Sequence, residues 1–551
     1  MTENARSILD PGPSLPARVE IFDTTLRDGS QREGLSLTVN DKLRIARHLD
    51  DLGIHYIEGG WPGANPKDDE FFRRAPTELK LEAATLVAFG STRRAHRDAG
   101  SDDVLAALVE AGTDAVCIVG KSWDYHVTEA LRVDLDEGIA MVGDSVAFLV
   151  SQGKEVLFDA EHFFDGWKHN RDYALEVVQA AAGAGAACLV LCDTNGGTLP
   201  FEVARVVDDV VESTQARVGV HFHDDADCAV ANAVTAVRHG AEHVQGCLNG
   251  LGERTGNANL SSIIPNLVLK LGVDCIPRDR LTRLTPVSHA VAEIANQTLA
   301  PNQPYVGASA FAHKAGLHVS ALARRPDAYE HVDPEDVGNN TRLVVSEMAG
   351  RATVVMKAQE LGIDLEDDRD TVTKVLEDLK SLEHAGYHFE VADGSFELLI
   401  RSAMGWDQDY FRLESFRVIM EKRTGADGSE GGVATEATIK LWAGGERYIA
   451  TAEGNGPVNA LDRALRDCIG RRYPELAGIH LADYKVRVLD TGSGTAAVTR
   501  VLIDTTDGLT NWGTLGVHEN IIEASWEALS ESLVVGLLRA ERLRSGGDES
   551  G

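Results

Sequence analysis

The stretch RVGVHFHDD, residues 217–225, carries the pattern that decides the fold: a short apolar run of β-strand character ends in a cluster of polar side chains. The same pattern recurs along the first half of the chain, with helix-like segments such as 40–52, 101–112, 171–185, 200–214 and 226–240 between the recurrences. We count eight such runs: VEIFDTT (19–25), HYIEGG (55–60), EAATLVAFG (82–90), DAVCIVG (114–120), KEVLFDAEH (154–162), CLVLCDTNGG (188–197), RVGVHFHDD (217–225) and HVQGCLNGLGER (243–254).

This strict alternation places the chain in the α/β class. Over roughly 250 residues it predicts a closed (β/α)8 TIM barrel. An open, doubly wound sheet would show the same alternation. The barrel is favoured because no glycine-rich dinucleotide-binding loop follows the first strand.

Length and composition predict a soluble globular protein with more than one domain. A chain of 551 residues is too long to fold around one ordinary hydrophobic core. The sequence holds no apolar run long enough for a membrane span, and its first twenty residues do not resemble a secretory signal, so we expect a cytoplasmic protein. The balance of 53 basic against 86 acidic residues gives a net charge of −33, which disfavours nucleic acid and anionic lipid as partners. An anionic substrate would then need local arginines or a metal.

The seven cysteines include no CxxC pair, which argues against a disulfide framework and a structural zinc site. Cys188 and Cys192 lie in the apolar run CLVLC and are predicted to be buried thiols of a strand.

The rest of the chain divides by its pattern. We expect an N-terminal tail (1–18), the barrel (19–274), a helical linker and subunit-contact region (275–409), a C-terminal domain (410–541) and a flexible tail (542–551). The C-terminal domain predicts a doubled βββα unit, in which three strand-like runs precede a helix twice.

The polar residues at the strand ends suggest a metal site. His221 and His223 are two apart on a strand, so both imidazoles point to the same face. With Asp28 they would form a two-histidine, one-carboxylate set that suits Mg²⁺, Mn²⁺, Zn²⁺ or Fe²⁺ without selecting among them. The alternative is that one or both rings only form hydrogen bonds in a loop.

Arg27 precedes Asp28, and its planar guanidinium matches a carboxylate held by two-point contact. A 2-oxo acid could chelate the metal while Arg27 holds its carboxylate. The alternative is that Arg27 pairs with Glu58 or Glu33 and only holds the barrel mouth together.

Six motifs in order closely resemble the isopropylmalate/homocitrate/citramalate synthase family of barrel metalloenzymes. They are TLRDGSQREG (25–34), GGWPGANPKD (59–68), DTNGGTLP (193–200), HFHDDADCAVANA (221–233), NGLGERTGNANL (249–260) and AFAHKAGLHVSA (310–321), and the resemblance runs from about residue 19 to about residue 538. Within that family, GGWPGANPKD and the segments YKVRVLD (484–490) and GTAAVTRVLI (494–503) look most like the citramalate synthases.

The resemblance implies roles for individual residues. Glu161 and Thr194 match positions that line the substrate pocket, and Tyr329 matches a tyrosine linked to catalysis. His318 matches a histidine that a neighbouring subunit supplies as general base. This stretch reads HVSA where isopropylmalate synthases carry HQDG, so His313 remains a competing candidate. The implied metal ligands are Asp28, His221, His223 and Asn257, and Arg27 would bind the 2-oxo acid carboxylate.

The resemblance also implies an activity and partners. The expected enzyme is an acyltransferase that condenses acetyl-CoA with pyruvate, with a divalent metal (Mg, Mn or Zn), in isoleucine biosynthesis. The alternatives are a 2-isopropylmalate synthase that uses 2-oxoisovalerate, a carbon–carbon lyase on the same barrel, and a non-catalytic binding protein. The family's C-terminal domain further implies a homodimer or higher homo-oligomer and an amino-acid effector, with isoleucine first. A dimerisation module without ligand is the plain alternative.

Overall fold

The computed structural model describes residues 15–314, 321, 325, 328–345, 349–365, 368–407, 410–424, 430–489, 494 and 496–546. They divide into two compact units, Met1–Phe311 with Glu330–Thr341 and Ala312–Tyr329 with Arg342–Gly551.

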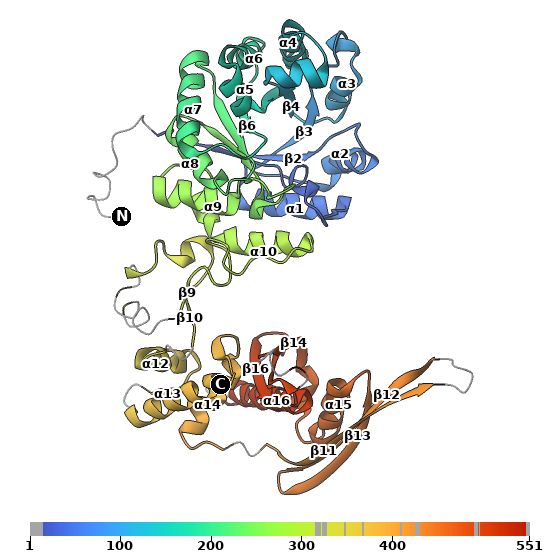
Figure 1. The fold of residues 1–551 in the computed structure, drawn as a ribbon, viewed down its shortest axis with the longest axis vertical. Coiled ribbons are helices and arrows are strands. Elements are labelled where there is room, and N and C mark those ends of the chain that lie inside the picture. Colours follow the sequence, from blue (N-terminus) through green and yellow to red (C-terminus); the bar gives the residue numbers. More distant parts are fainter. Residues whose placement is uncertain are drawn as a thin grey trace. The chain divides into compact units, whose positions relative to one another are not determined.

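The first unit contains a closed barrel of eight parallel strands, each hydrogen-bonded to its neighbours in chain order (Figure 1). The ring closes where β8 pairs with β1, so that Glu20 lies opposite His243 and Asp23 opposite Gly246. This closure confirms the (β/α)8 prediction and excludes the open sheet. The strands are β1 (Glu20–Asp23), β2 (Tyr56–Gly60), β3 (Thr85–Ser91), β4 (Ala115–Lys121), β5 (Glu155–Glu161), β6 (Cys188–Asp193), β7 (Val218–Phe222) and β8 (His243–Gly246).

Helices cover the outside of the barrel (Figure 1). Local sequence sets their ends: α1 begins after Thr38, whose side chain forms a reciprocal capping box with Asp41, and stops at Gly53, which has a φ of 92°. The helices of this unit are α1 (Val39–Leu52), α2 (Pro66–Glu78), α3 (Asp103–Glu110), α4 (Leu135–Ser151), α5 (Phe163–His169), α6 (Arg171–Gly183), α7 (Pro200–Thr214), α8 (Ala229–Arg238), α9 (Leu260–Pro265) and α10 (Leu284–Ile294).

The barrel interior is filled by alternate side chains of the strands, as the period of two requires. Cys188 and Cys192 lie there as buried free thiols, which confirms the prediction for CLVLC. The interior cluster consists of Phe22, Tyr56, Val87, Phe89, Ala115, Cys117, Leu157, Cys188, Val190 and Cys192. Because this packed layer fills the barrel, the polar strand ends lie at its mouth.

The second unit holds the doubled βββα unit predicted from the sequence. Two antiparallel sheets have the strand orders β11-β12-β13 and β14-β15-β16, and each is followed by a helix, α15 or α16. The bounds are β11 (Arg412–Thr424), β12 (Glu430–Ala443), β13 (Glu446–Gly454), α15 (Pro457–Ile469), β14 (His480–Val488), β15 (Thr499–Thr506), β16 (Asn511–His518) and α16 (Ile521–Gly546).

Shorter elements precede this doubled unit in the same part of the chain. A two-stranded parallel pair, β9 (Ala312–His313) with β10 (Arg342–Leu343), is followed by α12 (Arg351–Glu360), α13 (Arg369–His384) and α14 (Asp393–Ala403). The three helices share a hydrophobic cluster with the second sheet through Leu515.

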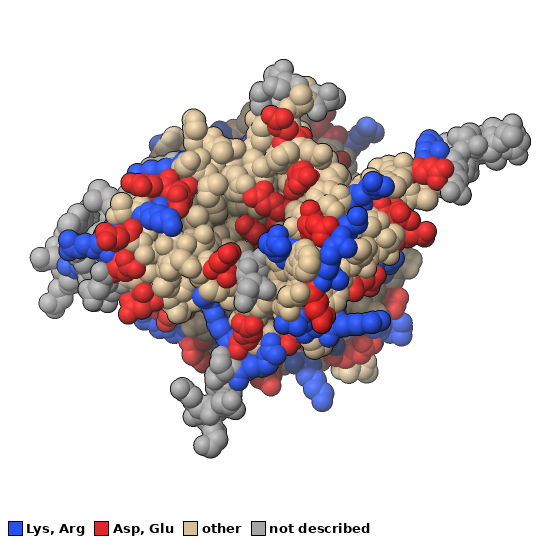
Figure 2. All heavy atoms as spheres, turned by 90° about the horizontal axis from the view of Figure 1, so that it is seen from below, with Lys and Arg blue, Asp and Glu red and all other residues tan. Residues whose placement is uncertain are grey.

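Acidic and basic side chains lie interspersed on the face drawn in Figure 2. Positive charge for an anionic substrate is therefore expected at particular arginines and not from the general surface. Among the described residues, no helix combines the length and the apolar character of a membrane span.

We predict that Asp50→Ala destabilises the barrel. The buried Asp50 carboxylate accepts hydrogen bonds from the backbone N–H groups of Glu82, Ala83 and Ala84, at 2.8–3.1 Å. Its loss leaves these donors without partners and should lower the free energy of unfolding by about 3 kcal/mol. Urea unfolding followed by circular dichroism measures this. Asp51→Ala is the matched control, because Asp51 is exposed and forms a surface ion pair with Arg283. Equal effects of the two substitutions would contradict the assignment.

Candidate metal-dependent active site

Hydrogen bonds to Asp23, the last residue of β1, hold the loop that follows this strand. The buried Asp23 carboxylate accepts hydrogen bonds from Thr25 N at 2.8 Å, Thr25 Oγ1 at 3.0 Å and Leu248 N at 3.2 Å. Burial raises the pKa of Asp23 to about 7, against the effect of these hydrogen bonds. The loop that carries Arg27 and Asp28 is thereby tied to the segment after β8.

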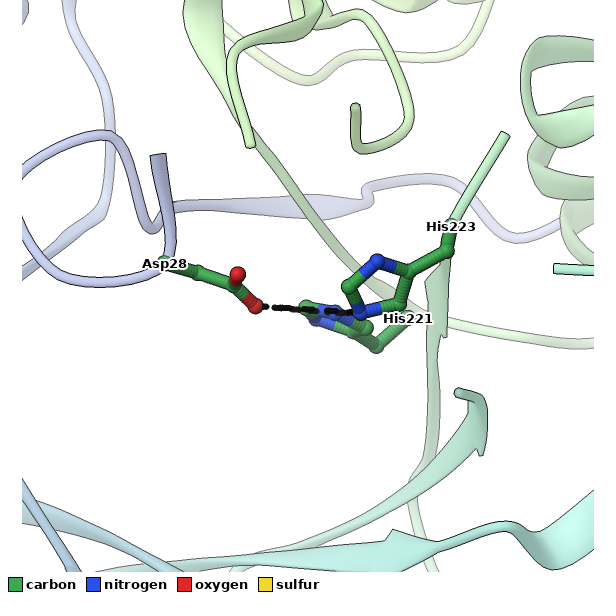
Figure 3. A group of neighbouring side chains, drawn as sticks. All are labelled: Asp28, His221 and His223. Carbon is green, nitrogen blue, oxygen red and sulfur yellow. Dashed lines mark hydrogen bonds and ion pairs between the residues drawn. The ribbon is translucent and has the colours of Figure 1, made fainter. Parts of the chain in front are cut away.

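Asp28, His221 and His223 converge at the barrel mouth, with Asp28 facing the two rings from the opposite loop (Figure 3). The His221 and His223 Nε2 atoms lie 3.4 Å apart, and Asp28 Oδ2 lies 3.5 Å from the first and 3.9 Å from the second. All three side chains are buried. The structure thus brings together the three residues of the predicted set.

The chemistry of this group fits a small divalent ion. Ligand atoms about 2.1 Å from an ion and at right angles to one another are separated by roughly 3 Å, close to the spacing seen. Asp28 Oδ1 and Asn257 Oδ1 are buried and, among the described residues, have no hydrogen-bond partner. Such atoms are costly to bury unless something binds them, and an ion would do so.

The three groups also change one another's pKa. Burial alone would raise the pKa of Asp28, but Arg27 and the two histidines hold it well below its usual range. Burial alone would lower the pKa of His221, but the hydrogen bond and charge of Asp28 raise it. Burial, assisted by His221, lowers the pKa of His223 to about 4, so this imidazole is neutral at pH 7 and free to bind a metal.

Asn257 adjoins the group through its backbone. It forms an isolated antiparallel bridge with His223, and its side-chain amide donates to Leu251 O at 3.2 Å. Asn257 lines a smaller neighbouring cavity of 260 Å³ and is not among the residues that line the main one. Two observations support Asn257 as a fourth ligand: its backbone pairs with His223, and its side-chain Oδ1 has no hydrogen-bond partner among the described residues.

Arg27 is held in place from two sides. Its Nε donates to Glu58 Oε2 at 2.6 Å, and its guanidinium carbon lies 3.8 Å from the centre of the Phe89 ring. Burial raises the pKa of Glu58 to about 7, although Arg27 opposes the shift. The pairing with Glu58 foreseen as an alternative is thus present. It does not exclude substrate binding, because Arg27 also lines the main cavity.

The main cavity, of about 750 Å³, joins these residues to the other predicted pocket residues. Glu161 lines it and forms an ion pair with Lys121. Thr194 also lines it, and its hydroxyl accepts a hydrogen bond from His162 N at 3.0 Å. The cavity is large enough for a drug-sized ligand.

His318 lies outside the described residues. Tyr329, with 43% of its surface exposed, and His313 both belong to the second unit. Their proposed catalytic roles stay predictions.

The structure places two further side chains, Asp159 and Gln245, next to the site, and the sequence analysis did not single them out. Asp159 lines the cavity and is fully buried, and its Oδ1 accepts a hydrogen bond from Gln245 Nε2 at 2.9 Å. Burial raises the pKa of Asp159. A signal existed, since Asp159 precedes Glu161 by two residues on one strand and so shares its face.

Three family models together match most of the chain. The HMGL-like family matches residues 18–291, the homocitrate synthase post-HMGL domain-like family 305–386, and the LeuA allosteric (dimerisation) domain 390–536. An (R)-citramalate synthase of Streptomyces coelicolor is 56% identical over 521 residues, which are 94% of this chain and 97% of that protein.

The chain belongs to the (R)-citramalate synthase family. Another member, from Aquifex aeolicus, is 50% identical over 95% of this chain and 98% of its own length. A probable 2-isopropylmalate synthase of Methanopyrus kandleri is 32% identical over 93% of this chain and 97% of its own. The two (R)-citramalate synthases from Streptomyces coelicolor and Aquifex aeolicus are therefore more similar to this chain than that probable 2-isopropylmalate synthase is.

We predict that Asp28→Ala and His221→Ala each abolish metal binding and turnover while the fold is retained. Each substitution removes a ligand from the rim of the barrel and leaves the packed layer below it intact. Elemental analysis, circular dichroism and turnover of both variants test this. Full activity of a metal-free preparation of the unsubstituted protein would contradict it.

Proposed function

We propose that the chain condenses acetyl-CoA with pyruvate and hydrolyses the resulting thioester to give (R)-citramalate and CoA. One observation carries the proposal: five relatives named (R)-citramalate synthase are 44–56% identical over 94–95% of this chain. The convergence of Asp28, His221 and His223 beside Arg27 supports a metal-dependent reaction of a 2-oxo acid at this site.

Asp28, His221, His223 and Asn257 would hold the ion, which when bound supplies Lewis-acid polarisation of a substrate carbonyl. Arg27 binds the carboxylate of the 2-oxo acid. Its guanidinium is already immobilised by Glu58 and Phe89, so little side-chain entropy is lost when the substrate enters.

Activation of acetyl-CoA requires a general base. The methyl protons of acetyl-CoA are weakly acidic, so a positioned base must remove one while the enolate oxygen is stabilised. We propose His318 for this proton transfer, with Tyr329 and Glu161 assisting and His313 as the competing candidate. Glu161 lines the cavity of the barrel unit.

The C-terminal domain suggests regulation and assembly. Its match to the LeuA allosteric (dimerisation) domain supports a homo-oligomer with a small-molecule effector. We propose a homodimer inhibited by isoleucine, because the family's citramalate feeds the synthesis of that amino acid.

We predict that pyruvate is the best substrate in a panel of 2-oxo acids. Purified protein is incubated with acetyl-CoA, a divalent ion and each acid, and free thiol is followed. Each extra methylene changes binding by only about 1–3 kcal/mol, so discrimination should be clear but not absolute. Better use of 2-oxoisovalerate than of pyruvate would make the enzyme a 2-isopropylmalate synthase.

We predict that Arg27→Lys lowers kcat/KM for pyruvate about 100-fold, because an ammonium cannot reproduce two-point contact with a carboxylate. Arg32→Lys is the matched control, since Arg32 is an exposed arginine of the same loop. An unchanged kcat/KM in Arg27→Lys would assign Arg27 to a structural role.

We predict that isoleucine inhibits the intact enzyme and that a chain ending before Tyr410 loses this inhibition. Initial rates with and without isoleucine, leucine and valine test both statements. No response of the intact enzyme to any of the three would leave the domain a dimerisation module.

A further inference from the structure

A chain of hydrogen bonds crosses the barrel interior behind the metal-binding residues. His221 Nδ1 lies 2.9 Å from Gln245 Oε1, and Gln245 Nε2 donates to Asp159 Oδ1, also at 2.9 Å. All three side chains are buried, with relative exposures of 4%, 0% and 3% for His221, Gln245 and Asp159. No water is needed to complete this chain.

The strand register builds the arrangement. His221 on β7 and Gln245 on β8 are direct register partners, so their side chains point to the same side of the sheet. Asp159 reaches Gln245 from β5 across the interior. The three groups are therefore set by the barrel and not by a loop.

The direction of the chain can be deduced from its far end. Ionised Asp159 only accepts hydrogen bonds, so the amide nitrogen of Gln245 faces this carboxylate and donates to it. The carbonyl oxygen of the same amide must then face His221. In the neutral ring that binds a metal, Nδ1 of His221 therefore carries the proton, and the lone pair lies on Nε2, the atom that faces Asp28 and His223.

We propose that Gln245 and Asp159 are positioning residues that fix the tautomer and ring orientation of His221 for metal binding. This inference rests on the proposed metal-dependent function. It adds Gln245 and Asp159 to the site as residues that act through the ligand His221 and do not themselves bind the metal. Carboxylate or carbonyl partners behind a ligand histidine typically change metal affinity about 10–100-fold. His223 is different, because its Nδ1 has no hydrogen-bond partner among the described residues.

The first test is direct Mn²⁺ binding to Gln245→Met, followed by electron paramagnetic resonance of the free ion. Methionine is close to glutamine in length but can neither accept from Nδ1 nor donate to Asp159. We expect the Kd for Mn²⁺ to rise about 10–100-fold. Cys188→Ala, in the same barrel interior but outside the hydrogen-bond chain, is the control and should leave the Kd unchanged. An unchanged Kd in Gln245→Met would overturn the proposal.

A second test separates positioning from simple packing. In the metal-free protein labelled with ¹⁵N-histidine, at a pH high enough for His221 to be neutral, we expect the His221 signals to report the Nδ1-protonated tautomer, and a tautomer mixture in Gln245→Met. A structural role alone would lower the Tm of the metal-free protein and leave the tautomer unchanged, which would overturn the proposal.

A rescue guards against misfolding of the first variant. Gln245→Glu alone places two carboxylates together and should weaken Mn²⁺ binding. Adding Asp159→Asn restores a donor to the introduced carboxylate, which still accepts from Nδ1, so the double variant should recover most of the affinity. Absence of recovery would overturn the proposal. If the unsubstituted protein binds no divalent ion, the proposed function itself fails, a result distinct from normal metal binding with no effect of these substitutions.

Discussion

Closure of the eight-stranded barrel positions every part of the candidate metal site. The pairing of β8 with β1 ties the first strand to the last, so the loop after β1 lies beside the ends of β7 and β8. Asp28 consequently meets two histidines about two hundred residues later in the chain, a distance no local structure could bridge. In an open sheet β1 and β8 would be separate edge strands, and Asp28 would not lie beside His221 and His223.

The electrostatics of the mouth follow from that geometry. In a chain with a net charge of −33, an anionic substrate finds its positive charge in the partly buried Arg27 and in a site fit for a divalent ion. Glu58 compensates Arg27, and the Phe89 ring stacks on the guanidinium. The same contacts that make a buried charge tolerable also hold it still, which a two-point carboxylate contact requires.

Much of the barrel and part of the site could be predicted from the sequence, because the repeat of apolar residues in a strand or a helix is visible within a short stretch of chain. The apolar runs predicted the eight strands, and the spacing of His221 and His223 predicted that both point inward. The pairing of Asp159 with Gln245 could not be predicted, because it depends on which residues face each other across a closed ring. The base could not be placed by the same reasoning, because His318, Tyr329 and His313 lie beyond the barrel strands and their distance to its mouth depends on tertiary and subunit arrangement.

We propose that a 2-oxo acid binds directly to a metal ion held by Asp28, His221 and His223. The most direct measurement loads the protein with Mn²⁺, adds pyruvate labelled with ¹³C at the ketone and carboxylate carbons, and records electron–nuclear coupling. Direct coordination predicts strong coupling to both carbons, and loss of that coupling in His221→Ala. Weak coupling to both carbons in the unsubstituted protein would mean that pyruvate binds away from the ion, and would contradict the account.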